Sequence, residues 1–413
     1  MHIDSVSARE IPDTRGKPTI ETTITAGEFI ATASVPSGKS TGSHEALELR
    51  ERDGGVLTAI EHVEKEIAHA LMARAVASAD DVDELLIELD GTPDKSRLGA
   101  NAILSVSIAA QRLDALEAGV PLWKAIANRA GTTPAAPRLY VNVMNGGVHV
   151  HPAGALAEGD RFPLPFQEYI LVVEGLPSEA LAITREAFTK LGERLATLLK
   201  LDFNEVPMGD EGGYAPTFSA LDEPFELLDA LVAEFPHTSI AIDAAASELY
   251  KDGAYHLIGK SYTPDDLARE YARLADQFPF HSIEDPFAED AGTDFAKLTA
   301  TIGNKVIVIG DDLTVTNPHR IKDAIDHKEI NGVLIKPNQI GTVMEAIRAV
   351  KMTQQAGWAA VCSHRSGETD DTFIADFAYG CGAHGIKAGG LGQKERLEKY
   401  ERLLEIEMEA KTV

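Results

Sequence analysis

Three short apolar runs in the C-terminal two thirds of the chain each lead into a carboxylate. Asp243 follows SIAI, Glu284 follows HSI, and Asp311 follows VIVIG. Three carboxylates that converge would offer the oxygen ligands that Mg²⁺ prefers, whereas the thiolates and clustered imidazoles that favour zinc are missing from these positions. The pattern therefore predicts a magnesium site.

A second aspartate, Asp312, comes directly after Asp311. Successive side chains on a strand point in opposite directions, so only one of the two can face the predicted metal. The spacing alone leaves open which of them does.

Basic and polar side chains follow three further apolar runs. Lys336 follows GVLI, Lys387 follows HGI, and His364, Arg365 and Ser366 follow AAVCS. A lysine beside Mg²⁺, Arg365 and a second lysine should lose its proton more easily than in water, which would let it act as a base. Arg365 can fork onto a phosphate or carboxylate, with Ser366 as an added donor. The alternative is that both lysines only form salt bridges with the three carboxylates.

Short apolar strands that alternate with helices must position these residues. Such alternation predicts parallel β/α units, and about eight of them favour a closed β/α barrel. No glycine-rich dinucleotide fingerprint favours an open sheet instead. One hairpin, ELYKDGAYHL, interrupts the order with Asp252 and Gly253 at its turn. The expected strands are YVNVMN, EYILVVE, SIAIDAA, FHSIEDP, VIVIGDD, GVLIKPN, AAVCSHR and HGIKAGG.

A smaller α+β unit precedes the barrel. Residues 3–35 alternate like an antiparallel three-stranded meander, and apolar spacings of three and four then predict helices. The stretch RAGTTPAAP marks the boundary, so we expect an N-terminal α+β capping domain over residues 1–132 and the barrel over residues 138–413. The expected helices lie near residues 43–52, 56–75, 79–89, 100–118 and 121–130.

The composition narrows the classes of function. The formal charge of −27 over 413 residues argues against binding to nucleic acid or to anionic membranes. No window approaches the roughly 18 apolar residues of a membrane span, and the N-terminus lacks a secretion signal, so we expect a cytoplasmic protein. Cys362 and Cys381 are too few for a disulfide framework and are expected to be buried thiols.

Taken together, these segments resemble the enolase family over almost the whole chain. The resemblance implies a hydro-lyase of glycolysis, phosphopyruvate hydratase, that dehydrates 2-phosphoglycerate to phosphoenolpyruvate with two Mg²⁺. It also implies a homodimer or an assembly of dimers. The segments are SVPSGKSTGSHEALELR, RLGANAILSVS, VNVMNGGVH, GDEGG, IDAAASE, SIEDPFAED, GDDLTVTNP, LIKPNQIGT and SHRSGETDD.

The resemblance also implies a role for each site residue. Lys336 would remove the C2 proton, and Glu211, aided by Glu168, would protonate the departing C3 hydroxyl. Lys387 would neutralise the substrate carboxylate. The remaining residues would bind metal or substrate: Asp243, Glu284 and Asp311 the first metal, Ser40 the second metal with phosphate, His364, Arg365 and Ser366 the phosphate, Gln167 the substrate, and His149 would close over the site.

The sequence departs from the family pattern at several positions. Lys39 replaces an alanine in the Ser-Gly-Ala-Ser loop, and Ala388 and Gln393 replace a threonine and an arginine after Lys387. About ten extra residues separate His149 from FQEYI. Two glutamates could therefore match the family glutamate that follows this histidine. Glu158 keeps the family's distance from the histidine in sequence, and Glu168 keeps the local Gln-Glu-aromatic context. Glu168 is favoured because a strand fixes its side chain in place.

Two other functions remain open at this stage. A superfamily relative that abstracts a proton next to a carboxylate in another acid would need neither Glu211 nor the phosphate-binding trio. A noncatalytic scaffold would be expected to lose at least one metal or catalytic residue, and all are present.

Overall fold

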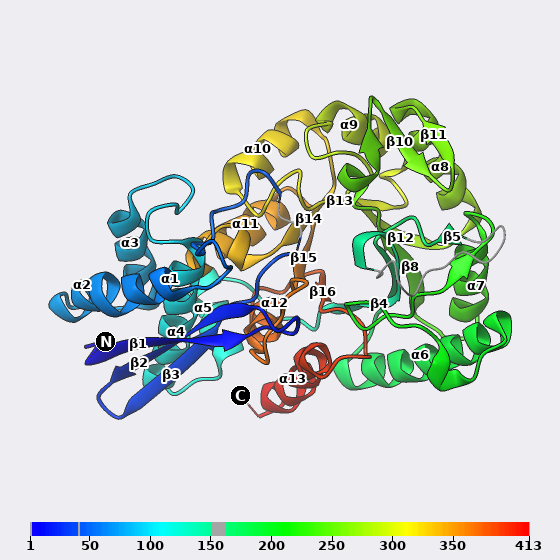
Figure 1. Ribbon diagram of the computed structural model, residues 1–413. Coiled ribbons are helices and arrows are strands. Elements are labelled where there is room, and N and C mark those ends of the chain that lie inside the picture. Colours follow the sequence, from blue (N-terminus) through cyan, green and yellow to red (C-terminus); the bar gives the residue numbers. More distant parts are fainter. Residues whose placement is uncertain (1, 40–41, 150–161, 413) are drawn as a thin grey trace.

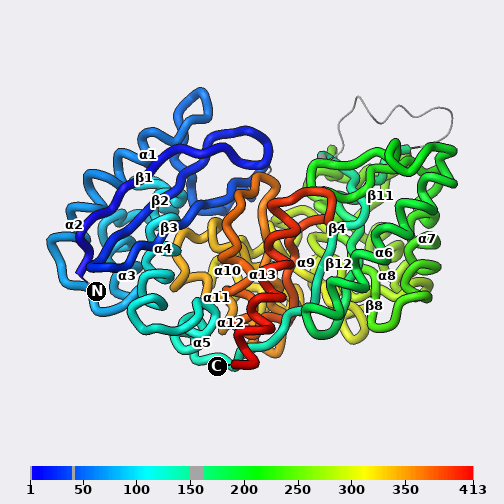
Figure 2. Tube along the Cα trace, turned by 90° about the horizontal axis from the view of Figure 1, so that it is seen from below, coloured from blue at the N-terminus to red at the C-terminus, as the bar shows by residue number. Residues whose placement is uncertain are grey.

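The computed structural model describes residues 2–39, 42–149 and 162–412. The N-terminal sheet and its helices lie beside the barrel in Figure 2.

The N-terminal sheet is an antiparallel meander of β1 (Ser5–Pro12), β2 (Pro18–Ala26) and β3 (Phe29–Ser34), as its alternating sequence predicts. Helix α4 (Ala100–Ala118) packs across β2 and β3 and is buried on nearly every side, which explains its run of small and aliphatic residues. It ends at Gly119, whose φ of 64° is left-handed. The other helices here are α1 (Leu57–Glu61), a π-helix (His62–Ile67), α2 (Ala68–Ala73), α3 (Ala79–Asp90) and α5 (Leu122–Ala130).

The helix expected near residues 43–52 is wrong. This stretch has no regular structure, because its backbone groups bond to distant partners instead of to one another. The amides of Ala46 and Leu47 donate to the carbonyls of Gln339 and Asp94 at 2.8 Å. Long-range pairing therefore overrides a helix-like apolar spacing.

Eight strands close into a barrel, as the sequence predicts, and helices lie on its outside (Figure 1). Around the barrel the strands follow chain order. They are β4 (Arg138–Asn145), β6 (Glu168–Val173), β8 (Thr238–Asp243), β12 (Phe280–Glu284), β13 (Ile307–Gly310), β14 (Gly332–Ile335), β15 (Ala359–Ser363) and β16 (Gly385–Lys387).

The helices that follow the barrel strands range from 8 residues in α12 to 23 residues in α6. They are α6 (Pro177–Leu199), α7 (Glu223–Val232), α8 (Pro264–Gln277), α9 (Gly292–Ile302), α10 (Pro318–His327), α11 (Val343–Gln355), α12 (Phe373–Gly380) and α13 (Lys394–Ala410).

One barrel strand departs from the expected parallel arrangement. Strand β6 runs antiparallel to both of its neighbours, β4 and β8. A parallel neighbour needs a crossover connection, usually a helix, whereas β4 returns as β6 with no α-helix in the described part of the connection, so the two strands pair antiparallel.

Short strands lie outside the barrel. The predicted hairpin is present as β9 (Tyr250–Lys251) and β10 (Ala254–Leu257), and β11 (Lys260–Tyr262) extends it. Strands β5 (Phe162–Pro163) and β7 (Thr217–Phe218) form a separate antiparallel pair. In the part of the chain that the structure describes, no helix is long and apolar enough to cross a membrane.

Two histidines stack inside the barrel at the end opposite the predicted site. The Nε2 atoms of His281 and His384 lie 2.9 Å apart, and Tyr140 packs edge-on against His281. Burial, and then the charge of Arg138, lower the pKa of each histidine from 6.5 to about 4. Both side chains are therefore neutral in the folded protein at pH values where they would be protonated in the unfolded chain.

This pair predicts a loss of stability in mild acid. The unfolded chain binds more protons below pH 6.5, so the free energy of unfolding should fall as the pH drops from there towards about 4. Allowing for partial exposure, we expect about 1 kcal/mol per histidine by about pH 5. Denaturant titrations should give a flatter pH profile for His384→Gln than for the exposed control His327→Gln. Equal profiles would contradict the prediction.

Candidate active site

The strand face that lines the barrel interior also supplies side chains at the barrel mouth. Ile309 and Leu334 pack inside the barrel. Alternate residues of a strand share a face, so Asp311 and Lys336, two positions further on, point into the mouth. They meet there as an ion pair between Lys336 Nζ and Asp311 Oδ2.

Asp311 and Asp312 follow the end of β13, and they differ in their partners although one carboxylate oxygen of each lies within 4.8 Å of the other. Asp311 also accepts a hydrogen bond from Gln339 Nε2 at 2.9 Å, within the mouth. Asp312 lies against Gly42 of the N-terminal domain, where a Cβ atom on the glycine would come within 2.9 Å of Asp312 Oδ1. Asp311 is therefore the member of the pair that faces the other site residues.

Lys387, at the end of β16, is surrounded by three carboxylates. Its Nζ lies 2.9 Å from Asp243 Oδ2, 2.8 Å from Glu284 Oε2 and 3.0 Å from Glu168 Oε2. All four side chains are buried. Although burial disfavours the ammonium form, the three carboxylates raise the pKa of Lys387 well above its usual range.

The lysines therefore form the salt bridges that the sequence left as an alternative. They reach the carboxylates directly. The expected lowering of the Lys336 pKa is also not seen. Burial and Arg365 lower that pKa, but Asp311 and Glu284 outweigh them and raise it.

A second group, which shares Glu168 with the group around Lys387, brings two carboxyl groups and an imidazole together. One ligand atom from each of Glu168, Glu211 and His364 lies within 4.8 Å of the others, and all three side chains are buried. Burial raises the pKa of Glu168 well above its usual range, and the neighbouring Glu211 adds to this shift against the opposing effect of Lys387. A protonated carboxyl near neutral pH is the form that can donate a proton.

The loop after β15 presents His364, Arg365 and Ser366 from a rigid support. Buried Arg396 of α13 contacts His364 Nδ1 and donates from Nη2 to the Ser366 carbonyl at 3.1 Å. An arginine only donates, so His364 Nδ1 accepts and the ring is neutral. Burial and Arg396 lower the pKa of His364 in agreement with this.

Arg365 is held by a residue of the N-terminal domain. Glu45 accepts two hydrogen bonds from the guanidinium, at 2.8 Å to Nη1 and 3.1 Å to Nη2, and Asn338 accepts a third at 3.1 Å. A forked pair of this kind fixes the plane of the guanidinium. The N-terminal domain therefore takes part in positioning the site.

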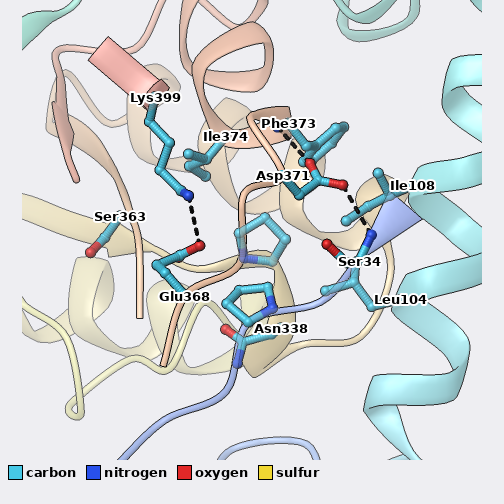
Figure 3. A pocket seen from close by; sticks show the side chains of 12 residues that line it. Ser34, Leu104, Ile108, Asn338, Ser363, Glu368, Asp371, Phe373, Ile374 and Lys399 are labelled. Atoms are coloured by element: carbon cyan, nitrogen blue, oxygen red, sulfur yellow. Dashed lines mark hydrogen bonds and ion pairs between the residues drawn. The ribbon is translucent and has the colours of Figure 1, made fainter. Parts of the chain in front are cut away.

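Behind this loop lies a cavity of about 400 Å³ between the N-terminal domain and the barrel (Figure 3). Lys399 of α13 points across it to Glu368, with 2.9 Å between Nζ and Oε2. On the other side Asp371 accepts from the Ser34 amide at 3.0 Å. These contacts anchor the far end of the loop, since Glu368 also accepts from the Arg365 amide at 3.0 Å.

Most of the predicted site residues share one cavity at the barrel mouth. It encloses about 320 Å³ of empty space. Its lining residues are Gln167, Glu168, Glu211, Asp243, Lys336, Ser363, His364, Arg365, Ser366 and Lys387.

Comparisons with known proteins place this geometry in a family. The family model for "Enolase, N-terminal domain" matches residues 3–126, and that for "Enolase, C-terminal TIM barrel domain" matches residues 134–412. The chain belongs to the enolase family. Among curated relatives, it is 43% identical to Enolase B of Dictyostelium discoideum over 99% of this chain and 95% of that protein. It is 42% identical to Enolase of Methanopyrus kandleri over 98% and 95% of the two chains.

Membership makes the chain a lyase of the phosphopyruvate hydratase type, as the sequence motifs predict. It implies the dehydration of 2-phosphoglycerate to phosphoenolpyruvate, and it suggests a divalent metal.

The predicted metal ligands have the donor chemistry for a hard divalent cation, although the three aspartates whose oxygens lie within 4.8 Å of one another are Asp285, Asp311 and Asp312. Asp243, Glu284 and Asp311 all offer carboxylate oxygens, and two of them already surround the ammonium of Lys387. Burial and the charge of Asp243 raise the pKa of Glu284 well above its usual range, so the carboxylates repel one another. A divalent cation would relieve that repulsion better than a single lysine.

Of the remaining predicted site residues, Gln167 contacts a predicted metal ligand, and the others are described in part or not at all. Gln167 reaches Asp243, with 3.4 Å between Nε2 and Oδ2. The backbone of His149 ends a 3-10 helix over Gly147–His149. Ser40 and Glu158 lie outside the described residues.

Sequence reasoning missed Glu45, Arg396 and Lys399. Glu45 stands inside the quoted stretch SVPSGKSTGSHEALELR, so its motif was visible but its partner Arg365 was not. Arg396 and Lys399 lie on the last helix, α13, where a basic residue ordinarily indicates a solvated face, and only their complete burial reveals them.

Proposed function

We propose that this enolase-family lyase dehydrates 2-phosphoglycerate by Mg²⁺-dependent chemistry in which a lysine base and a glutamate acid act from different walls of the cavity. The observation that carries the proposal is that one cavity contains Lys336, the Glu168 and Glu211 pair, and the His364 to Ser366 trio. A proton acceptor, a proton donor and an anion grip are the parts that such a reaction needs.

Lys336 is the proposed base for the C2 proton. It extends into the mouth from the end of β14, and its amide is fixed by Thr316 Oγ1 at 2.8 Å. Its Nζ forms an ion pair with Asp311. Lys336 would therefore have to lose a proton and leave this partner before it could accept the C2 proton. Arg365 and Lys387 disfavour its ammonium form, but Asp311 and Glu284 outweigh them and raise its pKa, so the base role would require another cation to occupy these two carboxylates.

Glu211 is the proposed acid for the C3 hydroxyl, with Glu168 as its partner. Hydroxide is a poor leaving group and needs a proton as it departs. Two buried carboxyl groups that share a site hold one proton between them, and the raised pKa of Glu168 supports this arrangement.

The anionic ends of the substrate have separate proposed partners. Lys387 would meet the carboxylate, on which negative charge builds as the C2 proton leaves. His364, Arg365 and Ser366 would hold the phosphate, with His149 above it. Gln167 would add a hydrogen bond from the rim.

We propose that Asp243, Glu284 and Asp311 hold one Mg²⁺ and that Ser40 helps to hold a second. When bound, these ions would stabilise the negative charge that develops on the substrate carboxylate. The donor set supports this assignment, because it consists of oxygen atoms only and lies at the ends of β8, β12 and β13.

Metal binding should distinguish the two neighbouring aspartates. Asp311→Asn removes a charge that faces the mouth and should weaken Mg²⁺ binding by about tenfold or more. Asp312→Asn, the matched control against Gly42, should change it far less. Calorimetric titration of each variant with Mg²⁺, without substrate, measures this. Similar dissociation constants for the two variants would contradict the assignment.

A substrate comparison tests the proposed function against its closest competitor. The competitor abstracts a proton next to a carboxylate in an unrelated acid and has no use for the phosphate grip. Product formation should be far faster with 2-phosphoglycerate than with glycerate or other 2-hydroxy acids without phosphate. Turnover of a phosphate-free acid at a comparable kcat/KM would favour the competitor.

The assembly and the location of the protein stay predictions. A homodimer or an assembly of dimers would appear as twice the 44.3 kDa chain mass or a multiple of it in analytical ultracentrifugation. The cytoplasmic location follows only from the composition and from the glycolytic role that the family implies.

A further inference from the structure

Lys39 connects three loops that surround the candidate active site. Its backbone amide donates to Ser366 Oγ at 2.6 Å. Its side-chain Nζ donates to the Val148 carbonyl at 2.9 Å and to Asp210 Oδ2 at 2.8 Å. These partners lie far from Lys39 in the chain, so one residue of the N-terminal domain ties together loops after β3, β4 and β15 and the loop before β7.

Each tied position borders a proposed functional residue. Ser366 belongs to the phosphate grip, Val148 precedes His149, and Asp210 precedes Glu211. We propose that Lys39 is a positioning residue that holds these loops in register for substrate binding. This inference rests on the proposed function for its kinetic part.

The Lys39 ammonium forms an ion pair with a carboxylate of the protein itself. The Asp210 carboxylate neutralises it at ion-pair distance, and the two side chains are 35% and 20% exposed. A lysine paired in this way acts through the loops that it fastens, whereas a lysine that binds phosphate directly would present its ammonium to the cavity. Lys39 is also not among the residues that line the described part of that cavity.

A second departure from the family pattern reaches the same residue. Gln393 donates from Nε2 to the Asp210 carbonyl at 2.7 Å and accepts from Arg396 Nε at 2.7 Å. In the resemblance, position 39 is an alanine and position 393 an arginine. Both altered positions therefore contact Asp210.

Kinetics should separate positioning from a purely structural role. Lys39→Ala should raise the KM for 2-phosphoglycerate by about three- to tenfold and change kcat less, as expected for a partly exposed ion pair. Asp210→Asn should act in the same direction, and the double variant should be no worse than Lys39→Ala alone, because the Lys39 substitution already removes the contact with Asp210. Lys65→Ala, which removes an exposed ion pair with Glu61, is the matched control and should leave KM unchanged.

Salt gives a readout that a packing defect would not. The ratio of KM between Lys39→Ala and the unchanged protein should shrink as NaCl rises from about 0.1 M to about 1 M, because screening weakens the ion pair in the unchanged protein. A direct phosphate ligand predicts a different result: Asp210→Asn would lower KM, and the two substitutions would not be equivalent. That outcome, additive effects, or a KM within twofold for Lys39→Ala would overturn the inference.

Hydrogen exchange tests, without any turnover, whether Lys39 holds these loops together. In the substrate-free protein, peptides that contain Lys39 or Val148 should exchange faster in Lys39→Ala, and the Lys65→Ala protein should match the unchanged one. If the unchanged protein fails to convert 2-phosphoglycerate, the proposed function is contradicted. Hydrogen exchange alone then tests the positioning role of Lys39. If it converts the substrate but neither hydrogen exchange nor KM responds to Lys39→Ala, the positioning role of Lys39 is contradicted and the proposed function is not.

Discussion

Lys336→Ala should abolish both turnover and the exchange of the substrate C2 proton with solvent, with a loss of at least about a thousandfold for a missing base. Glu211→Gln should also block dehydration but should leave C2 exchange intact, because the acid acts at C3 after the proton has left C2. Deuterium wash-in at C2, followed by mass spectrometry, measures exchange separately from product formation.

The control for this pair is Lys322→Ala, an exposed lysine of α10 that should change neither rate. Equal loss of exchange in the Lys336 and Glu211 variants would refute the division into base and acid. Normal exchange in Lys336→Ala would remove the lysine from its role.

Glu168→Gln should lower the dehydration rate by on the order of a hundredfold or more, the usual scale for lost acid or base assistance. Glu168 is buried between Lys387 and the Glu211 and His364 group, so a neutral amide would remove both its charge and its shared proton. Steady-state kinetics with saturating Mg²⁺ measures the effect.

Two matched variants make this result specific. Glu174→Gln lies just beyond the far end of β6, is exposed, and should be nearly silent. Glu158→Gln tests the other register that the sequence left open, and it too should do little. Greater damage in the Glu158 variant than in the Glu168 variant would show that the register is wrong.

The residues at the ends of the barrel strands were predictable from sequence because a short physical rule controls them. Strand residues alternate between two faces, and the carboxyl ends of barrel strands converge. Asp243, Glu284 and Lys387 therefore meet although they come from β8, β12 and β16. The contacts of Asp311 with Lys336 and Gln339 distinguish it from Asp312, which the sequence could not do.

The features that sequence reasoning missed depend on contacts between distant segments. Residues 43–52 have helix-like apolar spacing, but their amides bond to Gln339 and Asp94, and Glu45 is thereby carried to Arg365. Strand β6 reads like its neighbours, and only the connection that precedes it reverses its direction. Local hydrophobic periodicity predicts neither the partner of a backbone amide nor the direction of a strand.

The pairing of the lysines has a similar origin. An expected metal would surround itself with Asp243, Glu284 and Asp311, and each lysine would then face a cation. In the structure Lys387 and Lys336 pair with these carboxylates. The sequence could supply the residue types, but the protonation preference of a lysine depends on which charges lie beside it.

The most direct test of the central claim is the appearance of phosphoenolpyruvate absorbance when 2-phosphoglycerate is added to the purified, chelator-treated protein before and after Mg²⁺. We predict no signal before Mg²⁺, a steady rise after it, and no rise with Lys336→Ala under the same conditions. No rise with Mg²⁺ present, in a protein whose unfolding transition shows it to be folded, would contradict the account.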